Sequence, residues 1–107
     1  MATRREKALD RLFRALASAP RREILRLAAR QKCAVTQFAT QLNMSQPAVS
    51  KHVRILVDAA LLTKTRDGRY RWCRLRRGGL EPARESIEEL CEAVPLISQS
   101  RGTQARR

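Results

Sequence analysis

Aromatic residues are scarce in this chain, which contains two Phe, one Tyr and one Trp in 107 residues. Proteins that bind single-stranded nucleic acid use exposed aromatic rings on which the bases stack. Phe13 and Phe38 each belong to an apolar stripe with helical spacing, which predicts a core position for both. Tyr70 and Trp72 share one face of a predicted strand, where packing is the more common role of such rings. The sequence therefore argues against a single-strand-binding platform.

Long apolar runs are also missing. A membrane-spanning helix needs about 20 apolar residues in succession, and no segment approaches that length. Residues 1–20 superficially resemble a secretion signal with a cleavage site at Ala17-Ser18-Ala19, but Asp10, Arg11 and Arg14 interrupt any apolar core. Because a structural helix explains this segment better, the sequence predicts a cytoplasmic protein with no membrane partner.

Potential metal ligands and cysteine pairs are few. Three cysteines complete no disulfide framework, and cysteines of a cytosolic protein are normally free thiols. Cys33, Cys73, Cys91 and the single histidine, His52, cannot easily be assembled into the four tetrahedral ligands of a structural zinc site. We therefore expect no metal and no cofactor. Oxidation of the thiols stays open, although each cysteine more commonly serves as a small apolar side chain.

Acidic residues are outnumbered, since 10 Asp and Glu stand against 23 Lys and Arg and leave a net charge of +13. Residues 1–80 hold 19 of the basic residues and five acidic ones, whereas the other five acidic residues lie between Glu81 and Glu92. A surface of this kind favours a polyanionic partner. The carboxylates are scattered or confined to one predicted helix, so they do not form the cluster that a metal-dependent enzyme needs. We expect no catalytic activity.

The most informative segment is residues 35–60, whose spacing predicts two helices joined by a turn at Asn43-Met44. Ser45 is a good N-cap for the second helix, and a proline in the first turn of that helix loses no hydrogen bond. One face of the second helix is apolar. The other carries small, hydrogen-bonding or cationic groups that suit the major groove of DNA, and the predicted contact residues are Ser45, Gln46, Ala48, Ser50, Lys51, His52 and Arg54.

A β-hairpin is predicted directly after these helices. Residues 62–65 and 70–75 are β-prone, and Asp67-Gly68 between them suits a two-residue type I′ turn. In an isolated hairpin, arginines beside the turn would only keep the hairpin solvated. Placed behind a recognition helix, however, it favours contacts with phosphate or the minor groove, and the predicted contact residues are Arg66, Arg69 and Arg71.

The remaining pattern completes a single small domain. Amphipathic helices are predicted near residues 9–16, 19–30 and 81–93. The fold class that follows is mainly α with a small β-hairpin wing, a winged helix-turn-helix of about five helices and two to three short strands. We expect one domain over residues 1–97 and a disordered basic tail over residues 98–107.

Three motifs in this order resemble one family. Ser45-Gln46-Pro47-Ala48-Val49-Ser50-Lys51-His52 resembles the recognition-helix signature of ArsR-type bacterial winged-helix repressors. Ala15-Leu16-Ala17 with residues 21–25 resembles the opening helices of that family, and residues 68–75 resemble its wing, so the likeness covers about residues 9–90. The resemblance implies a homodimeric, sequence-specific regulator of transcription that binds an inverted-repeat operator in duplex DNA and represses by occluding a promoter.

The resemblance also implies that the first and last helices form the homodimer interface. Basic residues flank the stripe on the first helix and glutamates flank the stripe on the last, which favours their pairing across an interface. The alternative is that both stripes merely complete the core of one chain. The predicted interface residues are Leu9, Leu12, Phe13, Leu16, Ile87, Leu90, Cys91 and Val94.

Family members that hold arsenic or zinc use cysteine pairs on the first helix of the helix-turn-helix, or Asp and His residues on the last helix. This chain has Ala34-Val35-Thr36 where the family's cysteine pair would fall, and its last predicted helix contains no histidine. The resemblance therefore implies no metal site, and the effector stays unknown. In a winged helix the strand before the helix-turn-helix pairs with the second wing strand, which would bring Cys33 near Cys73. Cys91 would lie near the dimer seam.

A second class of function stays open, because net charge does not distinguish the binding of phosphate from the reading of bases. The alternatives are an RNA- or ribosome-associated basic winged-helix protein and a weakly selective architectural DNA binder. The octet at residues 45–52 favours duplex DNA.

Overall fold

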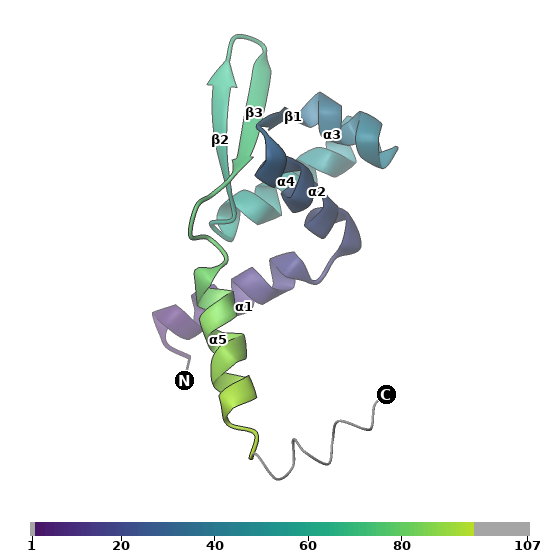
Figure 1. Ribbon diagram of the computed structural model, residues 1–107. Helices are drawn as coiled ribbons and strands as arrows, with labels where there is room; N and C mark the ends of the chain where they lie inside the picture. Colours follow the sequence, from purple (N-terminus) through teal and green to yellow (C-terminus); the bar gives the residue numbers. More distant parts are fainter. Residues whose placement is uncertain (1, 96–107) are drawn as a thin grey trace.

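The computed structural model describes residues 2–95, which form five α-helices and a three-stranded antiparallel sheet (Figure 1). This arrangement confirms the predicted mainly α winged helix-turn-helix with a hairpin wing. The tail expected at residues 98–107 lies outside the described residues. In chain order the elements are α1 (Arg4–Leu16), α2 (Ala19–Arg30), β1 (Cys33–Ala34), α3 (Val35–Leu42), α4 (Gln46–Asp58), β2 (Leu62–Asp67), β3 (Tyr70–Leu75) and α5 (Glu81–Glu92).

Side-chain caps explain where three of the helices begin. Thr3 and Glu6 form a capping box before α1, with N···O distances of 3.0 and 3.1 Å. The Ser18 hydroxyl accepts a hydrogen bond from the Arg21 N–H at 3.4 Å, and the Ser45 hydroxyl accepts one from the Ala48 N–H at 3.3 Å. As a result α2 and α4 begin where the sequence predicts.

The helix-turn-helix is formed by α3 and α4. The Gln37 side chain accepts a hydrogen bond from the Ala34 N–H at 2.7 Å where α3 begins. Asn43 ends α3 in the left-handed conformation with φ of 55°, which Asn tolerates better than most residues. The chain therefore reverses within the predicted Asn43-Met44 turn. Ser45 follows as the N-cap, and α4 begins at Gln46.

The core lies where α1, α2, α3 and α4 meet the inner face of the sheet. Phe38, Ile24, Leu56 and Val49 are fully buried. Cys73 of β3 is fully buried among them, so the sheet joins the same core as the helices. This single core fixes α4 against the rest of the domain and leaves its other face exposed.

The sheet has the strand order β1-β3-β2. Cys33 lies opposite Cys73, as predicted, and Lys64 lies opposite Cys73 on the other side. Because side chains alternate along a strand, Lys64 and Arg71 share the inner face with Cys73, whereas Trp72 belongs to the outer face. There the Lys32 ammonium lies 4.9 Å from the centre of the Trp72 ring, which supports a packing role for that ring.

The turn of the wing differs from the prediction. Asp67 pairs with Tyr70, so the two central residues are Gly68 and Arg69 rather than Asp67 and Gly68. Only Gly68 has a positive φ, at 62°, whereas a type I′ turn needs positive φ at both central positions. The register therefore places Arg69 in the turn itself.

Helix α5 packs beside α1 and extends away from the body of the domain (Figure 1). Gly79 precedes α5, and a Cβ atom at Gly79 would lie 2.6 Å from the Ala60 carbonyl oxygen. Only glycine allows this close approach to the end of α4. Ala83 is the buried residue of α5, so most of the apolar stripe on this helix stays exposed.

One predicted interface residue belongs to the core instead. Leu12 is only 3% exposed and packs among the buried residues of its own chain, because the inner side of α1 faces α2 and α4. The structure thus removes Leu12 from any surface between two chains. Among residues 2–95, no helix has the length and apolar character needed to cross a membrane.

Candidate nucleic-acid interface

The outer surface of α4 carries the side chains that the sequence predicts to meet DNA. Gln46, Lys51 and Arg54 are exposed, and Ala48 and Ser50 are half-buried. Ser45 is the N-cap of α4, and its hydroxyl accepts a hydrogen bond from the Ala48 N–H. The exposed side of α4 thus presents the Gln46 amide and the Ser50 hydroxyl near its start, and the cations Lys51 and Arg54 further along.

His52 has a partner within the protein. Its Nδ1 lies 3.2 Å from Nη1 of Arg21 on α2. A guanidinium only donates hydrogen bonds, so Nδ1 accepts and the ring is neutral with its proton on Nε2. Burial lowers the pKa of His52, and the positive charge of Arg21 lowers it further. One nitrogen of this ring is therefore occupied before any ligand arrives.

The wing arginines lie on the same side of the molecule as the N-terminal end of α4. Arg66 and Arg71 are directly opposite each other on β2 and β3, and both are exposed. Gln46, Arg69 and Arg71 together line a small hollow of about 80 Å³. The fold therefore brings Arg69 and Arg71 next to the N-terminal end of α4, whereas Arg66 lines a different hollow with Lys32 and Trp72.

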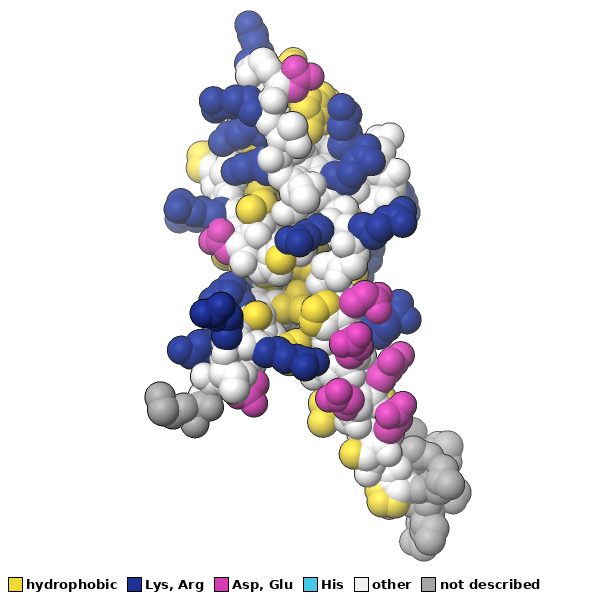
Figure 2. Space-filling model, turned by 90° about the vertical axis from the view of Figure 1, so that its left-hand side faces the viewer, with side chains coloured by type: hydrophobic (Ala, Val, Ile, Leu, Met, Phe, Trp, Pro, Cys, Tyr) yellow, Lys and Arg dark blue, Asp and Glu magenta, His cyan; other side chains and the backbone are white. Residues whose placement is uncertain are grey.

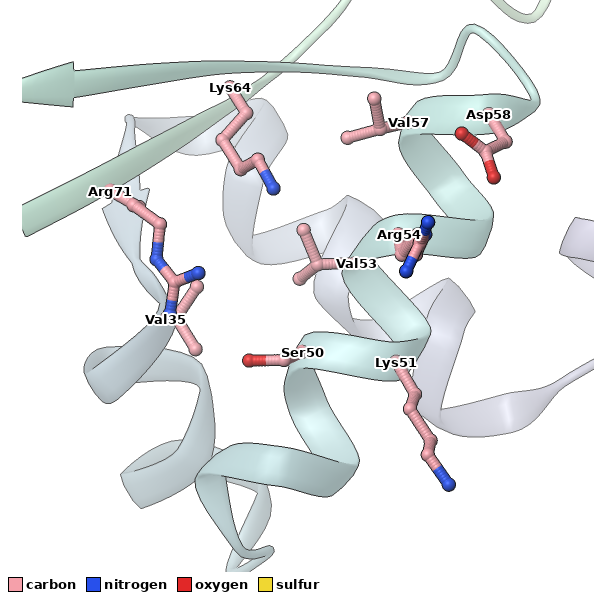
Figure 3. A pocket seen from close by; sticks show the side chains of 9 residues that line it. All are labelled: Val35, Ser50, Lys51, Val53, Arg54, Val57, Asp58, Lys64 and Arg71. Carbon is pink, nitrogen blue, oxygen red and sulfur yellow. The ribbon is translucent and has the colours of Figure 1, made fainter.

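A larger cleft of about 460 Å³ separates α4 from the wing (Figure 3). Ser50 and Arg54 line it from α4, while Lys64 and Arg71 project into it from the two wing strands. The sequence analysis missed Lys64. The alternation of Leu62, Lys64 and Arg66 along a strand whose Leu62 is buried was the signal that places Lys64 on the inner face.

Charge is distributed over the surface in two regions. In Figure 2 lysine and arginine side chains spread over the body and over α1, whereas the densest group of acidic side chains lies on α5 and the other acidic side chains in view are scattered. Apolar side chains lie between these regions, where α1 meets α5. The basic face with α4 and the wing suits a polyanion. The α1/α5 end is instead apolar where the two helices meet and acidic along α5.

The thiols are poorly suited to redox chemistry in this fold. Burial raises the pKa of the Cys33 thiol. Burial also raises the pKa of the Cys73 thiol, and the positive charges of Lys64 and Arg71 offset this only in part. A reactive cysteine needs a lowered pKa, so the raised pKa values of these two buried thiols disfavour a redox role for Cys33 and Cys73. Cys91 is exposed on α5.

Within residues 2–95, no three His, Cys, Asp or Glu side chains form a group that would hold a metal ion. Cys33 and Cys73 are paired on the sheet, while Cys91 belongs to α5 and His52 to α4. The absence of a metal site stays a prediction.

A helix-turn-helix whose second helix is exposed beside a basic hairpin defines a winged helix-turn-helix DNA-binding protein. Residues 19–64 match the family model described as bacterial regulatory protein, arsR family. The chain is 35% identical over 79 residues to an HTH-type transcriptional regulator of Mycobacterium tuberculosis, with 74% of each chain covered. It is 31% identical over 75 residues to the arsenical resistance operon repressor of Staphylococcus aureus, covering 70% of this chain and 72% of that one.

A solved structure gives the same result. The solution structure of a homodimeric winged helix-turn-helix DNA-binding domain from Mycobacterium bovis has a TM-score of 0.65 and 25% identity, with 86% of this chain and 88% of that chain covered. The chain therefore belongs to the ArsR family of bacterial regulatory proteins. It is a transcriptional regulator with a winged helix-turn-helix DNA-binding domain, and its relatives are regulators rather than enzymes.

Proposed function

We propose that this protein is a homodimeric repressor that binds an inverted-repeat operator in duplex DNA. The observation that carries the proposal is the joint placement of the exposed α4 surface and the wing arginines on one side of the domain. A helix fits the major groove, and the wing then reaches the neighbouring backbone and minor groove. The name of the Staphylococcus aureus relative supports repression as the direction of control.

The DNA-contacting residues follow from this placement. Side chains at the front of α4 would reach base edges and phosphates, and those of the wing would reach the backbone. The proposed set is Ser45, Gln46, Ala48, Ser50, Lys51 and Arg54 on α4 with Arg66, Arg69 and Arg71 on the wing. His52 does not belong to it, because its Nδ1 already accepts a hydrogen bond from Arg21. Ser45 contributes mainly by capping α4, because its hydroxyl accepts the Ala48 N–H.

The dimer would form along the exposed apolar side of α1 and α5. We name this surface the α1/α5 seam. Leu90 is 70% exposed, and Ile87, Val94 and Phe13 are 48%, 43% and 36% exposed in the single chain. So much apolar surface at one end of a small domain is typical of a protein–protein interface. The seam consists of the exposed Phe13, Ile87, Leu90, Cys91 and Val94 together with Leu9 and Leu16, which are half-buried and also pack against the core of their own chain.

Selection of bound sequences from random duplex DNA tests the proposed operator. A two-fold symmetric dimer with one recognition helix per chain should select two inverted half-sites whose centres lie about 10 bp, or a multiple of one helical turn, apart. Competition by duplex RNA and by single strands should be much weaker than by duplex DNA. Equal competition by RNA would favour the RNA- or ribosome-associated alternative, and absence of any selected sequence would favour an architectural DNA binder.

Gln46→Ala and Arg69→Ala should have different effects on DNA binding. If Gln46 contacts a base edge, its loss should reduce discrimination at one base pair by about 1–3 kcal/mol. If Arg69 contacts phosphate, its loss should weaken binding to selected and random DNA by similar factors. It should also reduce the magnitude of the negative slope of log K against log salt by about 0.9 per lost contact.

Binding isotherms on both DNAs across a salt series measure these quantities together. Lys32→Ala is the matched control for Arg69→Ala, because it removes one positive charge from the outer side of the sheet. An Arg69→Ala variant that kept the salt slope but lost discrimination would contradict this division of roles.

A further inference from the structure

The cleft between α4 and the wing contains uncompensated positive charge. Among residues 2–95 the ion pairs are Arg26 with Glu23 and Arg84 with Glu81, and none involves Lys64. Asp58, the one carboxylate that lines the cleft, lies at the end away from Arg71, next to Arg54 (Figure 3). The wing side of the cleft is therefore cationic without a local counter-charge.

The floor of the cleft strengthens the attraction for an anion. Val35 and Val53 are buried and line the cleft beneath Lys64 and Arg71, and the half-buried Val57 extends this apolar surface (Figure 3). Charges beside an apolar, weakly polarisable surface are screened less than charges in open water. The half-buried Ser50 adds a hydroxyl that donates a hydrogen bond without adding charge.

The geometry of duplex DNA identifies the anion. One sugar-phosphate strand separates the major groove from the neighbouring minor groove. When α4 occupies the major groove and the wing approaches the minor groove, that strand must pass between them, over the cleft. The cleft therefore faces backbone phosphates and not base edges.

We propose that Lys64, Arg71 and Ser50 form a seat for one backbone phosphate in each half-site. This proposal rests on the proposed DNA binding. It adds Lys64 to the residues that would contact DNA, as a contact to the backbone and not to a base. The ammonium and the guanidinium approach the phosphate from the wing, and the hydroxyl approaches from α4. Because both elements hold one phosphate, the seat would fix the angle at which α4 enters the groove.

Replacement of single phosphates by neutral methylphosphonates tests the seat directly. Each phosphate of a selected operator is replaced in turn, and binding of the wild-type protein is compared with that of Lys64→Gln. We expect one position per half-site at which the neutral linkage weakens wild-type binding about tenfold. Lys64→Gln should weaken binding to unmodified DNA by a similar factor. It should be less sensitive than the wild-type protein to replacement at that position, because only Arg71 and Ser50 still contact the phosphate.

Arg74→Gln is the matched control, because Arg74 loses the same charge from the outer face of the same wing. This variant should keep the wild-type sensitivity at every position. If Lys64→Gln also kept the full wild-type sensitivity at every position, the seat would be wrong although DNA binding would stand. Failure of the wild-type protein to bind any duplex would instead overturn the proposed function.

A different set of contacts connects α1 to the recognition helix. The Arg21 side chain donates hydrogen bonds to the Ala15 carbonyl at 2.8 Å and to the Arg14 carbonyl at 3.0 Å, while Arg22 donates to the Leu16 carbonyl at 2.7 Å. These carbonyls lie at the C-terminal end of α1, where cations are favourable, and the Arg14 carbonyl also accepts the Ala17 N–H at 3.1 Å. The same Arg21 guanidinium reaches His52 on α4.

We infer that Arg21 is a positioning residue that holds α4 against the C-terminal end of α1 through His52. This positioning role replaces the expectation that His52 contacts a base. Like the phosphate seat, the inference rests on the proposed DNA binding. Since α1 belongs to the proposed dimer seam, this connection would relate the orientation of the recognition helix to the dimer.

Two substitutions at His52 separate positioning from base reading. His52→Ala removes the acceptor and should weaken binding to selected and random duplexes by the same factor, about three- to tenfold. His52→Asn places Oδ1 where Nδ1 lies, so it accepts the Arg21 hydrogen bond and should restore both affinities. Sequence selection with each variant should return the wild-type operator.

Three results would overturn this inference. A changed preference at one base pair in His52→Ala would assign His52 to base reading. Unchanged affinity in that variant would show that the contact does not position α4. A loss that His52→Asn fails to restore would show that the imidazole ring, and not its acceptor, matters.

Discussion

Leu90→Glu should convert the protein from a dimer into a folded monomer. Leu90 is the most exposed large apolar side chain, at 70%, and it lies on the α1/α5 seam outside the core of its own chain. A carboxylate there would be buried without a partner if the dimer formed, and five glutamates on α5 already make the helix negative. The fold of each chain should survive, because Leu90 does not stabilise it.

The expected effect on DNA binding is large. A dimer binds its second half-site as an intramolecular event, and the loss of such a link lowers overall affinity by about 10²- to 10⁴-fold. Sedimentation measures the oligomeric state, circular dichroism the helix content, and binding isotherms the operator affinity. Leu90→Met is the matched control, since it keeps an apolar side chain of similar volume and should remain a dimer. A dimeric Leu90→Glu with wild-type affinity would show that the seam is misplaced.

Phe38→Ala should destabilise the domain by about 3–5 kcal/mol, the usual effect of replacing a buried Phe by Ala. Phe38 is fully buried on α3, at the centre of the core that joins α3 and α4 to the sheet. The free energy of unfolding of a native protein is about 5–15 kcal/mol, so this loss removes a large fraction of the stability. DNA affinity should then fall with the folded fraction, because α4 is held by the same core.

Denaturant unfolding at one fixed protein concentration measures this change and avoids confusion with dimer dissociation. Tyr70→Ala is the control, because Tyr70 is 49% exposed on the wing and should change stability much less. Phe38→Leu should lie between the two. A loss of less than about 1 kcal/mol in Phe38→Ala would contradict the assigned core.

Local signals in the sequence were sufficient for most of the helix-turn-helix. Ser18 and Ser45 mark the starts of α2 and α4 because a hydroxyl at the N-cap satisfies a backbone N–H wherever the helix packs. Asn43 marks the turn because it tolerates the left-handed conformation. The pairing of Cys33 with Cys73 follows from the winged-helix topology that the family motifs imply.

Register was less predictable than the identity of the elements. Asp67-Gly68 is a strong turn signal, yet the observed turn is centred on Gly68 and Arg69. Both registers contain glycine at a position with positive φ. The two registers differ by a two-residue shift in pairing, so Leu62 and Cys73 share the buried face in either one. The alternation of side chains along the strands therefore does not choose between them.

The sequence by itself determined the class of protein, the order of its helices and strands, and which helix presents cations to solvent. Those properties depend on spacing, caps and charge, which act within a few residues. Only the tertiary structure decided that Leu12 is core, that Lys64 faces α4 across a cleft and that His52 is bound to Arg21. Each of these depends on elements far apart in the chain, and periodicity along one element does not specify what another element places against it.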